Sequence, residues 1–440
     1  MSMSTSKTDV KWICCQLGAR EHYAIPRALS RTGVLGCLIT DAWFPPSSLL
    51  AKVCGGESKL RDRFQSELRD ARVKAFNSSL IVFERLARVR GLEMWPSVLA
   101  RNHWFQHKVV SFLRSQLRKG AWLPRGFTLS TLNYQPILLS YSYTALEPFR
   151  YAKAHGWKTV LIQIDPGPEE EKIVAEEVAR VPELAGGWHP APAEYWAFWR
   201  EECKLADRIV VNSEWSRDAL AGVGVPTEKI IIIPLAYEAP EIRSQKPEIH
   251  NGRVYPTRFT FERPLRVLFL GLINLRKGVA RLLEAAQLLR DEPVEFWLVG
   301  PVEISNSRTI AEAGRRGFPQ GNDYRVKWFG PVTRNQAAEF YRNADVFILP
   351  TLSDGFAITQ LEAQARGLPI IISKNCGKVV ENGVNGIILD EPTAACIADA
   401  VRDCIANPDR LERLASTSHV RDKFTLQALA HQLQDLAGTL

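Results

Sequence analysis

Long hydrophobic runs are missing from this chain of 440 residues, and no apolar stretch approaches the ~20 residues of a membrane-spanning helix. The eight cysteines are scattered, without a C-x-x-C pair or a Cys/His cluster at metal-ligand spacing. These absences argue against an integral membrane protein, a disulfide scaffold and a zinc module. The polar stretch over residues 1–7 is also unlike a signal peptide. We therefore expect a cytoplasmic protein with reduced thiols.

Acidic side chains are scarce in the first third of the chain. Residues 1–164 carry 24 basic and 10 acidic side chains, a balance of +14, which leaves −6 for residues 165–440 within the net charge of +8. A one-sided field of this kind favours an anionic partner, such as nucleic acid, a membrane surface or a polyphosphate.

Short apolar runs alternate with amphipathic stretches along the chain, which is typical of β-α units around parallel sheets. The predicted buried strands are Val10–Leu17, Val34–Thr40, Pro136–Tyr141, Lys158–Ile164, Arg208–Asn212 and Ile230–Pro234 in the first half, and Leu265–Gly271, Glu295–Gly300, Arg325–Gly330, Val346–Pro350, Pro369–Ser373 and Gly386–Asp390 in the second. The stretch Ala239–Pro264 has four prolines and little apolar periodicity. We therefore predict an α/β chain with Rossmann-like, doubly wound domains over 1–240 and 262–415, joined by a linker over 241–261.

One basic stretch of the first half, Phe83–Arg125, does not fit a plain β-α repeat. It holds nine basic and two acidic side chains, interleaved with Trp95, Trp104, Phe105, Phe112 and Trp122. This pattern suits an interfacial helix on an anionic membrane. It also suits a helical pair packed on the sheet with its aromatic side chains in the core and its cations solvated, and we favour this second interpretation.

The most informative segment runs from Val346 to Ala363, where a predicted buried strand leads through a Ser-Asp-Gly turn into a helix. Backbone N–H groups from Gly355 to Thr359 would point out of the helix N-terminus, which binds phosphate readily. Glu362 follows Asp354 by eight residues, roughly 12 Å or less along a helix. That span suits a nucleotide sugar. The alternative interpretation, which each residue alone would favour, is that Asp354 caps a helix and Glu362 is a solvated surface acid.

This segment resembles the E-x7-E signature of the retaining glycosyltransferases of family 4, which have the two-Rossmann-domain GT-B fold. Residues 268–278 resemble the family's G-R-L-x-x-x-K-G turn, and the resemblance covers Arg266–Asp390, with a weaker likeness over Ala206–Pro234. It implies that the two domains face a central cleft and that residues 416–440 cross back to the first domain.

The resemblance also implies roles for particular residues. Lys277 would neutralise the donor diphosphate, Glu362 would bind the ribose and Asp354 the donor sugar. Backbone N–H groups of Ala357, Ile358 and Thr359 would hold the phosphates, and Val332 would lie against the base. The implied donor-binding set is Gly271, Arg276, Lys277, Val332, Gly355, Phe356, Ala357, Ile358, Thr359 and Glu362. Transfer in this family retains the anomeric configuration and needs no metal or other cofactor, which agrees with the lack of a metal-holding D-x-D motif.

Three positions depart from the family pattern. Asp354 replaces the usual first Glu, and Leu272 stands where a diphosphate-binding Arg is usual, a loss for which Arg276 would compensate. Asp165 takes the place of a His near the reaction centre. We predict Asp354 and Asp165 as the catalytic residues, although Asp165 also fits a simple turn role in its Asp-Pro-Gly-Pro sequence.

The acceptor side is predicted in the turn after the first strand. Gly18 permits a close turn toward the donor, and Arg20, His22 and Tyr23 are the proposed acceptor contacts.

The function implied is transfer of a hexose from a UDP- or GDP-sugar to a glycan or lipid-linked acceptor in polysaccharide assembly, at the inner face of a membrane. The alternative is a weakly active or inactive GT-B protein that binds a nucleotide or glycan or scaffolds a complex. Nucleic-acid binding is not expected, because no recognition module accompanies the charge.

Overall fold

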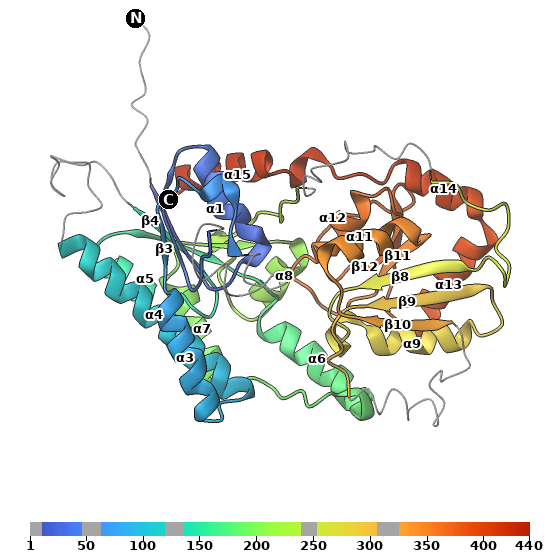
Figure 1. Cartoon of the computed structure of the whole chain (residues 1–440), viewed down its shortest axis with the longest axis horizontal. Helices are drawn as coiled ribbons and strands as arrows, with labels where there is room; N and C mark the ends of the chain where they lie inside the picture. The colour runs from blue at the N-terminus through green and yellow to red at the C-terminus, as the bar shows by residue number, and fades with distance from the viewer. Residues whose placement is uncertain (1–10, 46–62, 119–135, 239–252, 306–324) are drawn as a thin grey trace, which may run out of the picture.

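The computed structural model describes residues 11–45, 63–118, 136–238, 253–305 and 325–440. These residues form two lobes that lie side by side, each built on one sheet (Figure 1). Part of the predicted linker, residues 241–252, lies outside the described residues, as do residues 119–125 of the basic stretch.

The first sheet is wholly parallel, and in the described part of the chain it has seven strands in the order β3-β2-β1-β4-β5-β6-β7. Its strands are β1 (Trp12–Gln16), β2 (Leu35–Thr40), β3 (Val73–Ala75), β4 (Ile137–Tyr141), β5 (Lys158–Ile162), β6 (Arg208–Val211) and β7 (Ile230–Ile232). All six strands predicted for this half are present. The edge strand β3 was not predicted, because its three half-buried residues form no continuous apolar run.

Helices cover both faces of the first sheet, so its strands are apolar on both sides. Along β1, Trp12 and Cys14 belong to one hydrophobic cluster, and Ile13 and Cys15 to the cluster on the opposite face. The helices of this domain are α1 (Ala24–Arg31), α3 (Asn77–Val89), α4 (Met94–Arg118), α5 (Leu146–Ala154), α6 (Pro168–Arg180), α7 (Ala193–Leu205) and α8 (Glu214–Gly222).

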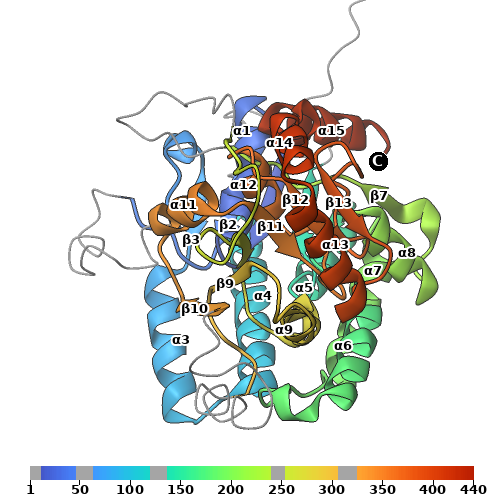
Figure 2. The ribbon, with the colours of Figure 1, turned by 90° about the vertical axis from the view of Figure 1, so that its right-hand side faces the viewer.

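The second sheet is also parallel, and its described strands follow the order β10-β9-β8-β11-β12-β13. Figure 2 shows the edge strands β10 and β13 on opposite sides of the second lobe. They are β8 (Leu265–Leu270), β9 (Val294–Val299), β10 (Val326–Gly330), β11 (Val346–Leu349), β12 (Ile370–Ser373) and β13 (Gly386–Leu389). The accompanying helices are α9 (Val279–Leu288), α11 (Arg334–Asn343), α12 (Thr359–Gln364), α13 (Ala394–Ala406) and α14 (Pro408–Ser416). The predicted fold class, two Rossmann-like doubly wound domains, is therefore confirmed.

Both sheets reverse their strand order beside the first strand, at β1/β4 and at β8/β11. In open parallel sheets, ligands bind outside the carboxyl ends of the strands at such a switch point. The predicted site residues follow these strands, with Gly18 after β1, Asp165 after β5, Lys277 after β8 and Asp354 after β11.

The last helix, α15 (Leu426–Gly438), packs on the first domain although it follows the second in sequence (Figure 1). Leu426, Leu429, Leu433 and Leu436 of α15 join the cluster that contains β1 and α1. Residues Asp422–Phe424 form the short helical turn that precedes it.

The basic stretch forms α3 and α4, which run antiparallel at one edge of the first lobe (Figure 1). Phe105, Val109 and Leu113 of α4 are fully buried against the sheet, as the helical-pair interpretation requires. Helix α3 differs, because much of its apolar surface is exposed. No described helix is long and apolar enough to cross a membrane.

Candidate active site

The loop after β8 is fixed by its own backbone. The Asn274 side chain accepts a hydrogen bond from the Lys277 N–H at 3.1 Å and caps the short helix Leu275–Lys277. Gly278 then turns with φ of +73°. Beneath the loop, a Cβ on Gly300 would collide with the carbonyl oxygen of Gly271, so these two backbones are in direct contact. The loop therefore presents Arg276 and Lys277 from a rigid base.

The turn after β11 approaches this loop and also touches the first domain. Asp354 Oδ1 accepts a hydrogen bond from the Phe356 N–H at 3.2 Å, which closes the Ser-Asp-Gly turn. Gly355 lies so close to the end of β5 that a Cβ would collide with the Ile164 carbonyl oxygen. The structure thus brings the segments of Asp354 and Asp165 together.

Asp354 is an ion-paired, nearly buried carboxylate. Its Oδ2 pairs with the Lys277 ammonium and lies 3.5 Å from Arg276 Nη1. Burial acts to raise the pKa of Asp354, but Lys277 and Arg276 outweigh burial and hold that pKa below its usual range. Asp354 is therefore anionic, and the two cations lie on one side of it.

Arg276 contacts acids of both domains. Its Nη1 donates to the Ser353 carbonyl oxygen at 3.2 Å and lies 3.6 Å from Glu170 Oε2 of α6. Burial acts to lower the pKa of this guanidinium, but Glu170 and Asp354 outweigh burial and raise that pKa. Leu272 is 38% exposed and contributes no cation.

Glu170 is a site residue that the sequence did not reveal. It lies in the first turn of α6 and accepts a hydrogen bond from the Ser353 hydroxyl at 3.0 Å, across the domain interface. Burial, Asp165 and Asp354 together raise the pKa of Glu170 to about 7, against the lowering effect of Arg276. The acidic run after Gly-Pro was the available signal, but it also fits an ordinary helix N-terminus.

The raised pKa of Glu170 predicts a pH-dependent stability. Between about pH 4.5 and about pH 7 the folded state keeps a proton that the unfolded chain releases, so stability from this group falls as pH rises through that window. Glu170→Gln stays neutral and keeps an acceptor for Ser353. We expect its melting temperature, relative to the unaltered protein, to increase from about pH 5 to about pH 8. A difference that is constant with pH in thermal unfolding would contradict this.

Glu362 lies further along the same segment, on α12. Its Oε2 accepts a hydrogen bond from the buried Tyr341 hydroxyl at 3.0 Å. Burial raises the pKa of Glu362, while Tyr341 and nearby Arg334 act to lower it. Glu362 is therefore a partly buried, positioned acid and not a surface one. Val332 is half-buried against the core of the second domain.

The backbone between Asp354 and Glu362 offers hydrogen-bond donors. Among the described residues, the N–H groups of Ala357, Ile358 and Thr359 have no acceptor, and Ala357 has a left-handed φ of +64°. Phe356, in contrast, is 2% exposed and its ring packs on Phe424, so its side chain belongs to the core and not to the site.

Asp165 is held by several donors. Its Oδ1 accepts hydrogen bonds from the Tyr143 hydroxyl at 2.6 Å, the Gln163 amide at 2.9 Å and the Gly167 N–H at 2.9 Å. It therefore forms the turn that its sequence suggested, and it also lines a cavity between the domains.

The structure separates Tyr23 from the other three predicted acceptor residues. The Gly18 N–H donates to Asp41 at 3.0 Å, and Arg20 is exposed, whereas His22 lines a cleft of about 950 Å³. Tyr23 lies in the core instead, fully buried against Trp43. The three consecutive residues Glu21 to Tyr23 have left-handed backbone conformations, and this explains why the Tyr23 side chain enters the core.

The cleft of about 950 Å³ has walls from both domains. His22, Arg27 and Tyr237 come from the first domain, and Arg334 and Ile358 from the second. Ile358 and Arg334 thus line the same cleft as His22, which lies in the turn after β1. No group of His, Cys, Asp or Glu side chains among the described residues is arranged to hold a metal ion.

Two Rossmann-like domains that face a charged cleft define the architecture of GT-B glycosyltransferases. The crystal structure of Anabaena Alr3699/HepE in complex with UDP shares this fold, with a TM-score of 0.59 and 15% identity, over 98% of this chain and 100% of that chain. Sucrose-phosphate synthase from Thermosynechococcus elongatus gives a TM-score of 0.59 at 16% identity, over 98% of each chain.

Residues 264–407 match the family model of glycosyl transferases group 1. A curated relative, the D-inositol 3-phosphate glycosyltransferase of Pseudarthrobacter chlorophenolicus, is 29% identical over 218 residues, which are 46% of this chain and 48% of the relative. The chain spans about half the length of the curated relatives it matches. The second domain thus carries the sequence likeness to this family.

Proposed function

We propose that the protein is a retaining, metal-independent glycosyltransferase that transfers a hexose from a UDP- or GDP-sugar to a glycan or lipid-linked acceptor. The observation that carries the proposal is the cluster of Asp354, Lys277 and Arg276 at the carboxyl edge of the second sheet, facing Asp165 and Glu170 of the first domain. The group 1 match over this domain supports it.

We assign the donor diphosphate to the side chains of Lys277 and Arg276, and the nucleoside to the cleft of about 950 Å³. Ile358 lines this cleft, and Glu362, one helical turn further along, would accept hydrogen bonds from ribose hydroxyls. The Anabaena protein, which shares the fold, was crystallised with UDP and with UDP-glucose. A uridine donor is therefore the first to test.

The geometry suggests how this chain's residues would act. An incoming diphosphate would take Lys277 and Arg276 as counter-ions, which would release Asp354 to accept hydrogen bonds from the donor sugar. As the bond between the anomeric carbon and the phosphate oxygen breaks, the two cations stabilise the charge on the leaving group. The acceptor oxygen bonds to the same face of that carbon, and its proton passes to the departing phosphate.

A panel of UDP-, GDP- and ADP-sugars tests the function by thermal stabilisation. A donor at about 100 times its Kd is expected to stabilise the folded protein by ~2.7 kcal/mol, and slow release of the nucleotide should follow. Glu362→Ala should weaken both. If no sugar nucleotide stabilises the protein, the proposal is wrong, whereas binding without nucleotide release under any condition supports the non-catalytic GT-B alternative.

We also propose that α3 brings the first domain to an anionic membrane surface. Ile81, Val82, Leu86 and Val89 are 41%, 57%, 49% and 86% exposed, on a helix that also exposes Arg85, Arg88 and Arg90. An apolar face flanked by cations is the pattern of an interfacial helix. Each arginine near an anionic surface adds ~1 kcal/mol of attraction.

The double variant Val82→Asp/Val89→Asp tests this surface. We expect its co-flotation with vesicles of phosphatidylglycerol and phosphatidylcholine to fall about ten-fold or more, because acids replace the apolar contacts and oppose the lipid charge. Val254→Asp is the matched control, since Val254 is 89% exposed and lies outside α3, in the segment between the two domains. Absence of flotation by the unaltered protein at low salt would refute the membrane proposal.

A further inference from the structure

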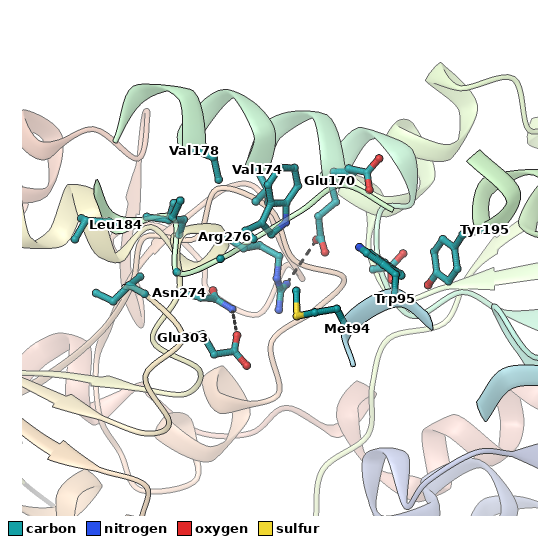
Figure 3. Close-up of a pocket in the computed structure, with 18 of the residues that line it drawn as sticks. Met94, Trp95, Glu170, Val174, Val178, Leu184, Tyr195, Asn274, Arg276 and Glu303 are labelled. Atoms are coloured by element: carbon teal, nitrogen blue, oxygen red, sulfur yellow. Dashed lines mark hydrogen bonds and ion pairs between the residues drawn. The ribbon is translucent and has the colours of Figure 1, made fainter. Parts of the chain in front are cut away.

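A second cavity between the domains, of about 520 Å³, adjoins the proposed donor site at Arg276, Asp165 and Glu170, and its other walls have no role in donor binding as proposed (Figure 3). Its walls come from α4, α6 and α7 of the first domain and from the loops at Arg276 and Glu303 of the second. The volume falls in the range of roughly 300–1,000 Å³ that is typical of small-molecule sites. Arg276 connects this cavity to the Asp354 ion pair.

Aromatic rings form one wall of this cavity. Tyr143 and Tyr195 are stacked, with centroids 4.5 Å apart at 19°, and Trp95 lies 4.8 Å from Tyr195. The Trp95 indole donates a hydrogen bond to the His189 carbonyl oxygen at 3.0 Å, which fixes its position. Figure 3 shows Trp95 and Tyr195 facing each other at one end of the cavity. The wall is therefore an ordered set of ring faces.

The backbone of Tyr143 is held in an unusual conformation. Its φ is +73°, which is strained for an aromatic residue. The buried Glu202 carboxylate accepts a hydrogen bond from the Tyr143 N–H at 2.7 Å, and the hydroxyl of Tyr143 donates to Asp165 at 2.6 Å. Such strain persists only where surrounding contacts enforce it, and it gathers at ligand sites. Here it places an aromatic ring beside Asp165.

The polar groups of the cavity are mainly hydrogen-bond acceptors. Asp165, Glu170, Glu171 and Glu303 supply carboxylates, and Arg276 supplies a guanidinium at the side that adjoins the donor site, so the acidic part of the cavity disfavours an anionic ligand. Carboxylates accept hydrogen bonds from hydroxyl groups, and ring faces carry partial negative charge that suits the C–H face of a sugar. Neutral carbohydrate meets both requirements.

We propose that this cavity binds a neutral sugar residue of the acceptor. The inference rests on the proposed function, and it deepens that function by naming the acceptor subsite. A sugar packed against the rings of Tyr195 and Trp95 would share the cavity with Asp165 and Arg276, and Arg276 belongs to the ion-pair cluster assigned to the donor. Met94, which is 56% exposed, lines the cavity at the start of α4, so a lipid-linked remainder would leave toward α3.

Binding of neutral disaccharides tests the inference. Maltose, cellobiose and lactose are titrated in the presence of UDP, with tryptophan fluorescence as the signal. We expect at least one to bind, and Tyr195→Ala to weaken that binding about ten-fold or more, since a buried aromatic anchor is lost. Trp95→Ala, at the partly exposed rim, should have a similar effect if it retains its melting temperature. Tyr195→Phe keeps the ring and should bind within about three-fold of the unaltered protein.

Phe261→Ala is the matched control, since Phe261 is an aromatic side chain that is 67% exposed in the segment between the two domains and does not line the cavity. The inference is overturned if none of the three disaccharides binds, or if Tyr195→Ala and Trp95→Ala bind as the unaltered protein does. A parallel titration with UDP alone separates the two proposals. UDP binding without disaccharide binding removes only the acceptor subsite, whereas failure of every sugar nucleotide and UDP removes the proposed function as well.

Discussion

Lys277→Ala is expected to lower donor hydrolysis by about 10²- to 10³-fold, as does removal of one preorganised group that stabilises developing charge. The ammonium of Lys277 pairs with Asp354 in the free protein and would move to the leaving diphosphate in the complex. Nucleotide release from the donor found in the sugar-nucleotide screen is the measurement. Lys204→Ala is the control, because Lys204 is 72% exposed and pairs with Glu201 of its own helix.

Lys277→Ala is also expected to lower the stability of the protein, and a double variant distinguishes this loss from the loss of catalysis. Lys277→Ala leaves the nearly buried Asp354 with Arg276 as its remaining cation, and breaking such a pair costs ~3 kcal/mol or more. Lys277→Ala/Asp354→Ala removes both charges, so it should be more stable than Lys277→Ala alone and still inactive. Hydrolysis at the unaltered rate in either variant would show that the ion pair has no part in the reaction.

Gly278→Ala is expected to destabilise the second domain by ~4 kcal/mol or more, in the exceptional range for one substitution. A Cβ there would collide with the Pro350 carbonyl oxygen at the end of β11, and φ is already +73°. Neither backbone can move without displacing the Lys277 loop or the turn that leads to Asp354. Thermal unfolding with and without UDP measures the loss.

Gly383→Ala provides the matched comparison. Gly383 has φ of +74°, but a Cβ there would meet nothing within 4 Å. The backbone conformation alone should cost ~1–2 kcal/mol. Equal losses at the two positions would show that the contact with Pro350 is not rigid, and the tight packing of the loop against β11 would then need another explanation.

The buried strands could be predicted from the sequence because both sheets are parallel and covered on both faces. Runs such as Val346–Leu349 are apolar without interruption, which reveals each strand whatever its neighbours. Strand order then places Lys277 and Asp354 together, because β8 and β11 are adjacent. The roles assigned to those two residues stay predictions.

The contacts across the domain interface could not be predicted in this way. Glu170 contacts Arg276 and Ser353 because the two domains face each other. No sequence pattern within α6 indicates these contacts. The left-handed conformation of Glu21 to Tyr23 could not be predicted from the sequence either, because residues other than glycine rarely adopt it. For this reason the sequence predicts Tyr23 as an acceptor contact, whereas the structure places it in the core.

The return of α15 to the first domain bears on the order in which the protein is completed during synthesis. The first domain leaves the ribosome well before α15 is translated, and domains generally fold as they emerge. Until α15 arrives, the face formed by β1 and α1 lacks the leucines that cover it. The cluster of the second domain is built from residues 259–411 together with Val181 and Leu184 of the first domain, so all of it is translated before α15. The N-terminal domain is thus started first and finished last.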